Sequence, residues 1–254
     1  MTKRQKFNKL SSQAQQEQLE KHFFDCITRG DAMAVADFLR DCPGAVRWQL
    51  IKDNDPLGVA ETALHVAARM GKLGVAQELL NASAPVDAKD SLDQTPLMSA
   101  AQFGRTDVMA CLLENRADPA AVMTEGTTAL MFAARNGPLE SAQMLLDKGA
   151  DVNQTDEGGD TALFFALHLE DNDDAYGMLR VLLEKGADMN LKNGDGFTVT
   201  DFAREEGKRD LANFIEDYAE QLDQAQEWEA EQAKRRDIEM MKTASPPPFR
   251  WAMR

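Results

Sequence analysis

The sequence predicts an all-α solenoid of about six helix-turn-helix repeats, and two regularities along the chain indicate it. Threonines recur at a constant spacing of 33 residues, in the order Thr62, Thr95, Thr128 and Thr161. A pair of leucines lies 17 residues after each of the first three threonines, at Leu79–Leu80, Leu112–Leu113 and Leu145–Leu146. A fixed period of this length is typical of stacked repeats that bury their apolar faces against their neighbours. Function is therefore expected on a surface and not in a deep pocket.

Each period contains the same sequence of local structures. The threonine begins a first helix, because its hydroxyl can accept a hydrogen bond from an early helical N–H. Gly71, Gly104 and Gly137 are expected to end that helix in the left-handed conformation. Leucines, valines and methionines at helical spacing then give a second helix its buried stripe, and Leu113 and Leu146 are expected to belong to it.

These segments resemble ankyrin repeats. Four copies of the Thr-x-Leu opening in register, each followed by small residues such as Ala67-Ala68 and Ala133-Ala134, carry the resemblance. The turn segments Gly149–Asn153 and Gly186–Asn190 match the start of the loop that ankyrin proteins project as a finger. The resemblance implies paired helices with finger loops and a role in protein–protein binding.

The array extends beyond the clear copies in both directions. Thr198 follows Thr161 by 37 residues, so this repeat carries four extra residues, and we expect them in the turn between its helices, around Glu170–Asp174. Upstream, Phe23–Leu39 aligns with Leu64–Leu80 but lacks the Thr-x-Leu opening, which is typical of a capping repeat. The predicted organisation is a basic and polar N-terminal segment (1–18), a repeat domain (19–222), a charged helical extension (223–242) and a Pro-rich tail (243–254).

The C-terminal part leaves two alternatives open for each of its segments. Apolar residues continue at helical spacing to Leu222 and Ala225, so the last helix is expected to run on for several turns. Beyond them it is either a solvated extension or a docking helix. The tail contains three consecutive prolines followed by Phe249 and Trp251. It is either a short motif read by another protein or a segment that folds back onto the array.

The charge of the chain restricts its partners. The formal net charge is −15, and the stretch from Asp151 to Asp223 holds 19 acidic and six basic residues, a balance of −13. Such a surface repels phosphate backbones, so nucleic-acid binding is not expected. The acidic half either attracts a protein partner with a basic surface or serves solubility alone.

Composition also bears on location. No apolar run approaches the length of about 18 residues needed to span a membrane, and the basic N-terminus lacks the apolar stretch of a secretion signal. The three cysteines show no paired spacing, which is typical of small buried residues in a reducing compartment. We therefore expect a cytoplasmic protein with no membrane contact.

The residues that carry chemistry are few and scattered. The three histidines fall in different repeats, with His22 expected before the capping helix and His65 at a position where ankyrin histidines bond neighbouring backbone. No spacing indicates a zinc site, a phosphate loop or a nucleophile with its base. The sequence therefore predicts no catalytic residues, no cofactor and no metal.

The resemblance implies that a partner binds the concave face, formed by the ends of the first helices and by the fingers. The helix-end positions are Arg69, Met70, Gln102, Phe103, Arg135, Asn136, His168, Leu169, Glu205 and Glu206. The finger positions are Val59, Glu61, Leu92, Gln94, Glu125, Thr127, Glu157, Asp160, Asp195 and Phe197. Apolar side chains at five of these positions should either meet water and mark the binding site or pack against the neighbouring finger, namely Met70, Leu92, Phe103, Leu169 and Phe197.

The predicted function is that of a monomeric, non-catalytic adaptor or inhibitor whose partner contacts Phe103 at the centre of this face. Two alternatives remain open from the sequence. One is a secreted bacterial effector that binds host proteins, and the other is an enzyme with a cryptic site.

Overall fold

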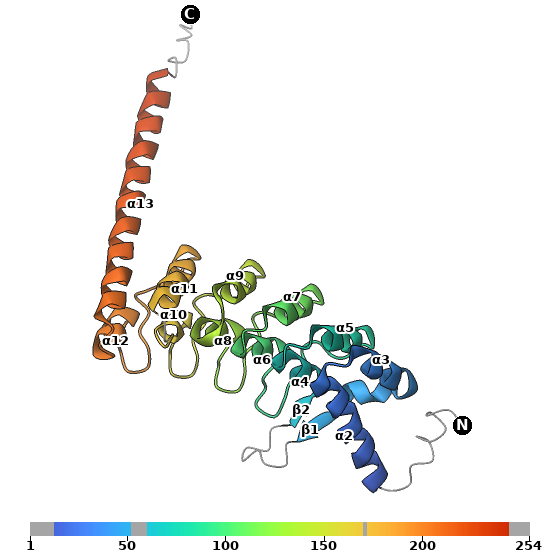
Figure 1. Cartoon of the computed structure of the whole chain (residues 1–254). Coiled ribbons are helices and arrows are strands. Elements are labelled where there is room, and N and C mark those ends of the chain that lie inside the picture. Colours follow the sequence, from blue (N-terminus) through green and yellow to red (C-terminus); the bar gives the residue numbers. More distant parts are fainter. Residues whose placement is uncertain (1–12, 52–59, 170–171, 244–254) are drawn as a thin grey trace, which may run out of the picture.

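The computed structural model describes residues 13–51, 60–169 and 172–243, in which the helices pack as two layers in a single row (Figure 1). The inner layer consists of α4 (Ala63–Arg69), α6 (Pro96–Gln102), α8 (Ala129–Asn136), α10 (Ala162–Ala166) and α12 (Val199–Glu205). The outer layer consists of α5 (Leu73–Asn81), α7 (Thr106–Glu114), α9 (Leu139–Asp147), α11 (Asn172–Glu184) and the start of α13 (Arg209–Thr243). The predicted all-α repeat solenoid is confirmed.

Small side chains set the distance between neighbouring inner helices. The alanine pairs of α4, α6 and α8 are completely buried, at Ala67–Ala68, Ala100–Ala101 and Ala133–Ala134. Because a methyl group is the whole side chain, the helix backbones can approach closely along the row. One continuous apolar core results, and it runs from Phe23 to Ile215.

The leucine pairs of the outer helices are buried unequally. Leu79, Leu112 and Leu145 are fully buried, and Leu113 is almost so. The expectation of full burial is wrong for Leu146, which is only half-buried, as is Leu80. Successive residues on a helix point about 100° apart, so the second leucine of a pair lies at the edge of the buried stripe.

The repeated threonines do not all cap their helices. Three hydroxyls accept a hydrogen bond from the backbone N–H three residues ahead: Thr95 from Met98, Thr128 from Met131 and Thr198 from Asp201. The expectation is wrong for Thr62 and Thr161. The Thr62 hydroxyl lies 2.8 Å from Nδ1 of His65, and the buried Thr161 hydroxyl has no partner among the described residues.

The glycines after the inner helices also differ. Gly71 and Gly104 have φ angles of 68° and 61°, as expected for left-handed helix ends. The same expectation is wrong for Gly137, whose φ is −90° and ψ 159°. Pro138 follows it, and the residue before a proline is driven to extended backbone. Glycine suits position 137 for another reason, since a Cβ there would lie 2.8 Å from the carbonyl oxygen of Ala133.

The four extra residues of the fourth threonine repeat lengthen its outer helix. α11 has 13 residues, whereas α5, α7 and α9 have nine each. The expectation of a longer turn is wrong for Asp173 and Asp174, which lie in the first turn of α11. Negative charge is favourable there because it faces the positive end of the helix dipole. Residues 170 and 171 lie outside the described residues.

The N-terminal end of the row is closed by a helix pair and a short hairpin. α2 (Gln13–Arg29) and α3 (Ala32–Asp41) pack on α4 and α5, followed by the 3-10 turn η1 (Pro43–Arg47). An aromatic group fills this end, with the ring centroid of Phe23 4.9 Å from Phe38 and 5.8 Å from Trp48. His22 lies within α2 and not before it, which corrects its predicted place.

A two-stranded hairpin forms where the sequence indicated no strand. β1 (Gln49–Ile51) pairs antiparallel with β2 (Ala60–Thr62), with Gln49 opposite Thr62. The finger position Val59 falls between these strands, in residues 52–59, which lie outside the described part of the chain.

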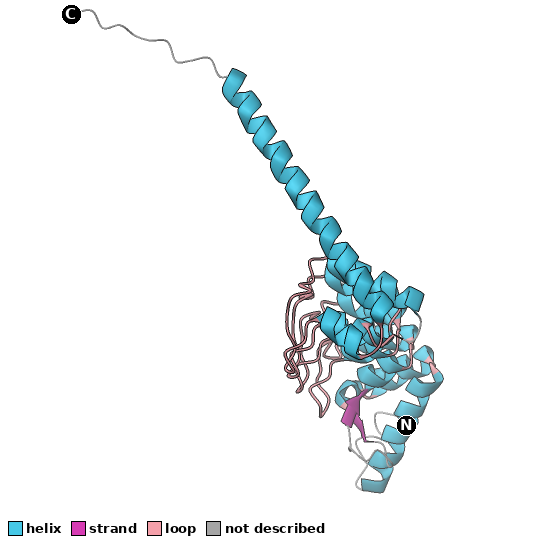
Figure 2. Cartoon of the chain, turned by 90° about the vertical axis from the view of Figure 1, so that its left-hand side faces the viewer, coloured by secondary structure: helices cyan, strands magenta, loops and turns pink. Residues whose placement is uncertain are grey.

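At the other end, α13 continues far beyond the array, as expected from its composition (Figures 1 and 2). Its first turns close the core through Leu211, Ala212 and Ile215, all buried. Farther along, Leu222 and Trp228 are exposed, and Trp228 is 65% exposed. At 1.5 Å per residue, its 35 residues measure about 52 Å. The basic start and the Pro-rich tail of the sequence lie outside the described residues.

Replacing Leu145 by alanine should lower the free energy of unfolding by about 2–5 kcal/mol, because it removes a fully buried side chain from the core between repeats. The matched control is Arg135→Ala, on an exposed helix end, which should change it by less than about 0.5 kcal/mol. Urea unfolding monitored by circular dichroism measures both. Equal losses would show that the buried and open faces are wrongly assigned.

The two kinds of threonine give a second test. Thr128→Val removes a capping hydroxyl and should cost about 1 kcal/mol. Thr161→Val replaces a buried hydroxyl that has no partner among the described residues, so it should be neutral or stabilising. Parallel thermal melts of the two variants decide this, and a larger loss at position 161 would contradict the assignment.

Candidate protein-binding surface

The inner helices and the finger loops form one continuous surface, which we call the concave face. Figure 2 shows the fingers projecting together to one side of the helices. Backbone hydrogen bonds join successive fingers: the N–H of Thr124 donates to Leu92 (3.2 Å), that of Glu157 to Glu125 (3.0 Å) and that of Gly194 to Gly158 (2.6 Å). The fingers are therefore fixed relative to one another.

Side-chain oxygens within the fingers hold the predicted binding residues in place. The Asp90 carboxylate accepts hydrogen bonds from the backbone N–H of Leu92 (2.8 Å) and of Gln94 (2.9 Å). The Asn193 amide oxygen does the same for Asp195 (3.2 Å) and Phe197 (3.1 Å). Asp90 and Asn193 are themselves buried. These supporting residues were not predicted, although a short polar residue ahead of each finger tip is the signal that marks them.

Three of the five predicted apolar residues on this face are exposed. Phe103 is 44% exposed, Leu92 38% and Phe197 37%. Met70 and Leu169 are half-buried, because their side chains pack against the core. The exposed apolar surface is therefore centred on α6 and the adjoining finger, with a second point at Phe197.

An aromatic row that was not predicted completes the face. Phe132, Phe165 and Phe202 each lie four residues after a repeat threonine and are half-buried. Residues three and four apart share one face of a helix, so each of these rings lies on the same face as the predicted helix-end positions. Phe103, which follows the end of α6, adds a fourth ring at a different position of its repeat. Val66 and Ser99 occupy the same position of the earlier repeats and have smaller side chains. This shared position is the sequence signal that could have identified the three phenylalanines.

Several predicted polar residues are tied to one another across the repeat. The Arg69 guanidinium donates two hydrogen bonds of 3.1 Å to the Glu61 carboxylate. The Gln94 amide donates to the Gln102 carbonyl oxygen at 3.2 Å. In both pairs, eight residues separate a finger from its own inner helix. These side chains therefore fix the finger. Glu61 is buried and does not line the face, whereas the other three are partly exposed.

Positive side chains gather toward the C-terminal half of the face. Burial lowers the pKa of His168, and the positive charges of Arg135 and Lys208 lower it further. The Lys208 ammonium donates to the backbone carbonyl of Leu167, beside that imidazole. Burial also raises the pKa of Asp160, the finger residue of the same repeat. This part of the face is thus a patch of mixed charge in an acidic chain.

The fingers carry exposed carboxylates. Exposed acidic residues lie at or near successive tips, at Asp93, Glu125, Glu157 and Asp195. Asp93 has a basic neighbour, since the Lys89 ammonium is 3.6 Å away. The remaining predicted residues Arg135 and Asn136 are exposed at the end of α8. The aromatic row therefore has negative charge along its finger side.

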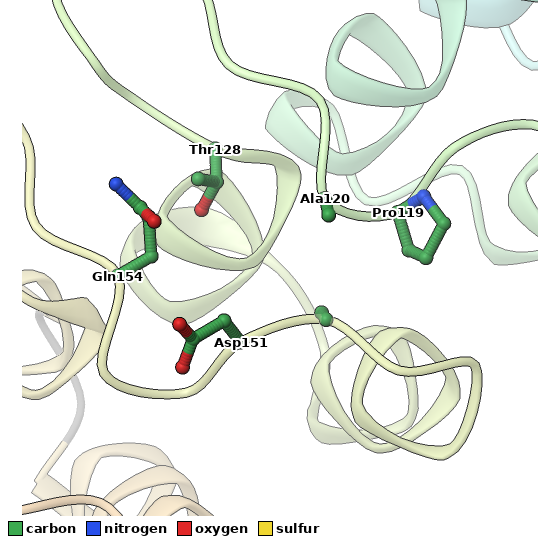
Figure 3. A pocket seen from close by; sticks show the side chains of 6 residues that line it. Pro119, Ala120, Thr128, Asp151 and Gln154 are labelled. Carbon is green, nitrogen blue, oxygen red and sulfur yellow. The ribbon is translucent and has the colours of Figure 1, made fainter.

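Two hollows among the described repeats are smaller than most small-molecule sites. Figure 3 shows one between successive fingers, where Thr128, Asp151 and Gln154 face a space of about 20 Å³. A space of this size holds about one water molecule. A second, of about 110 Å³, lies between α9 and α11 beside Pro138 and Asp174. Small-molecule sites in proteins usually measure about 300–1,000 Å³.

The histidines, cysteines and carboxylates of the described part are scattered. No cluster of three or more histidine, cysteine, aspartate or glutamate side chains could hold a metal ion among them. His65 is buried and structural: Nε2 donates to the Gln94 carbonyl at 2.8 Å, and Nδ1 accepts from the Thr62 hydroxyl at 2.8 Å. Across the same residues, no helix combines the length and apolarity needed to cross a membrane.

Comparison with known families agrees with this geometry. A family model for ankyrin repeats in three copies matches residues 32–123, 65–156 and 120–193, which together cover more than half of the chain. The chain therefore belongs to the ankyrin-repeat family. Ankyrin-repeat proteins are typically non-catalytic and serve as protein–protein interaction modules. A search of curated proteins finds no match to this chain.

Burial of His65 should make stability depend on pH. Its folded pKa lies below the ordinary value of 6.5, so the unfolded chain takes up a proton on this residue more readily than the folded chain. Stability should consequently fall as the pH drops below about 6.5. His168, whose pKa is also lowered, acts in the same direction.

The measurement is the melting temperature between about pH 7.5 and about pH 5.5. We expect His65→Gln to have a lower melting temperature than the wild type at the upper pH. On acidification, its melting temperature should fall by less than that of the wild type. The control His168→Gln measures how much of the pH dependence of stability comes from the second histidine. Parallel pH profiles for the wild type and His65→Gln would contradict the role of His65.

Proposed function

We propose that this protein is a non-catalytic adaptor or inhibitor that binds a partner protein across its concave face. The observation that carries the proposal is the apolar surface formed by exposed Leu92, Phe103 and Phe197, beside the half-buried rings of Phe132, Phe165 and Phe202. Exposed apolar patches on a folded protein often mark interaction sites.

The rigidity of the face supports this role. Successive fingers are joined through their backbones, and Asp90 and Asn193 fix the exposed residues within them. A surface that is ordered before binding loses little entropy when a partner arrives. Aromatic side chains held in this way commonly supply most of the energy of an interface.

Charge indicates the kind of partner. The finger carboxylates, Glu125 and Glu157 among them, favour a partner with a basic surface beside the apolar contact. Arg135, His168 and Lys208 would meet an acidic or polar group of the same partner near the aromatic row. We propose that the protein acts in the cytoplasm, is monomeric at low concentration, needs no cofactor and binds neither nucleic acid nor membrane.

Affinity capture from a native lysate tests the proposal. The double variant Phe103→Ala with Phe132→Ala should retain the partner at least about tenfold less than the wild type, because it removes two aromatic contacts. The matched control is Met33→Ala, which truncates an exposed apolar side chain of α3, away from this face. Undiminished capture by the double variant would exclude the concave face as the site.

Binding kinetics of the captured partner separate the contribution of the finger carboxylates from that of the aromatic contact. Glu125→Gln with Glu157→Gln should mainly slow association, and this effect should shrink as added salt screens the charges. Phe103→Ala should mainly speed dissociation.

A further inference from the structure

We infer that the concave face of one copy binds the Pro-rich segment 244–254 of a second copy. This inference rests on the proposed function, because it names an occupant for the same face. The segment reads Ala-Ser-Pro-Pro-Pro-Phe-Arg-Trp-Ala-Met-Arg and contains no acidic residue.

The composition of the segment matches the face feature by feature. Proline-rich segments bind grooves lined with aromatic side chains, since their extended conformation is largely preformed. The face offers the exposed ring of Phe103 and the half-buried rings of Phe132 and Phe165. Arg250 and Arg254 of the segment complement the carboxylates on the fingers, and guanidinium groups also stack on aromatic rings.

The length of α13 indicates that the segment contacts the concave face of another copy and not its own. The helix carries its last residue, Thr243, about 52 Å from its start at Arg209, beside the array. The eight residues from Thr243 to Trp251 span at most about 28 Å when fully extended. Figure 1 shows α13 leaving the row at α12 and pointing away from the other repeats. The aromatic part of the segment therefore cannot return to its own concave face.

The helix has the properties of a spacer. Beyond Leu222 its described side chains are mostly polar and exposed, Lys234, Arg235 and Arg236 among them. Glu231 accepts a hydrogen bond from Arg235 one turn later at 3.2 Å, a spacing that supports an isolated helix. A polar helix of this length holds the segment clear of its own array and within reach of another.

A defined probe tests the contact directly. A fluorescein-labelled peptide of residues 243–254 is titrated with the full chain, and its fluorescence anisotropy is followed. Saturable binding is expected, at least about tenfold weaker for a peptide carrying Phe249→Ala and Trp251→Ala. The protein variant Phe103→Ala with Phe132→Ala should weaken binding similarly, whereas Met33→Ala should leave it unchanged. No saturable binding, or equal binding by all variants, would overturn the inference.

Sedimentation of the full chain provides an independent measurement. Its average mass should rise with concentration, because a segment that binds the face of the next copy links copies head to tail. The full-length variant with Phe249→Ala and Trp251→Ala should remain monomeric over the same range. A concentration-dependent rise that persists in this variant would contradict the assigned occupant.

The two proposals fail in different ways. If the peptide does not bind but Phe103→Ala with Phe132→Ala still loses the lysate partner, the contact between copies is wrong and the proposed function stands. If the peptide binds and the same variant captures the lysate partner normally, the face serves self-association and the proposed function is wrong.

Discussion

The close stacking of inner helices is the contact on which the rest of this structure depends. Buried alanine pairs, such as Ala100–Ala101, let each inner helix lie directly against the next. Because this spacing is short, equivalent residues of successive repeats come into line, and the fingers approach closely enough to share backbone hydrogen bonds. A larger side chain at these positions would separate the repeats and break the finger contacts as well as the core.

Stacking of this kind divides the residues of a repeat into two groups. Those facing a neighbouring repeat are buried and must be small or apolar, whereas those on the concave face are free to vary. Half-buried aromatic rings lie at one shared position in three successive inner helices, at Phe132, Phe165 and Phe202, and exposed Phe103 follows the end of α6. Two hollows between the described repeats measure about 20 and 110 Å³, which favours recognition on an extended surface.

The apolar core is covered by different elements at the two ends of the row. At the N-terminal end, α2 and α3 cover the first full repeat, and an aromatic group around Phe23 fills the space that another repeat would occupy. At the C-terminal end, the first turns of α13 close the core through Leu211 and Ile215, and the helix then continues as a polar arm. One helix thus serves both as a cap and as a projecting element.

The sequence by itself determined the repeat, its helix pairs, the structural role of His65 and the placement of Leu92, Phe103 and Phe197 on the fingers and helix ends. These follow from a period of 33 residues, which places equivalent side chains in equivalent surroundings. Only the tertiary structure decided the half-burial of Met70 and Leu146, the placement of the extra residues in α11, the β1–β2 hairpin and the aromatic row through Phe132. These features depend on how far a neighbouring repeat covers a side chain or a backbone segment. That distance is set by packing between residues remote in sequence, which a pattern along the chain does not contain.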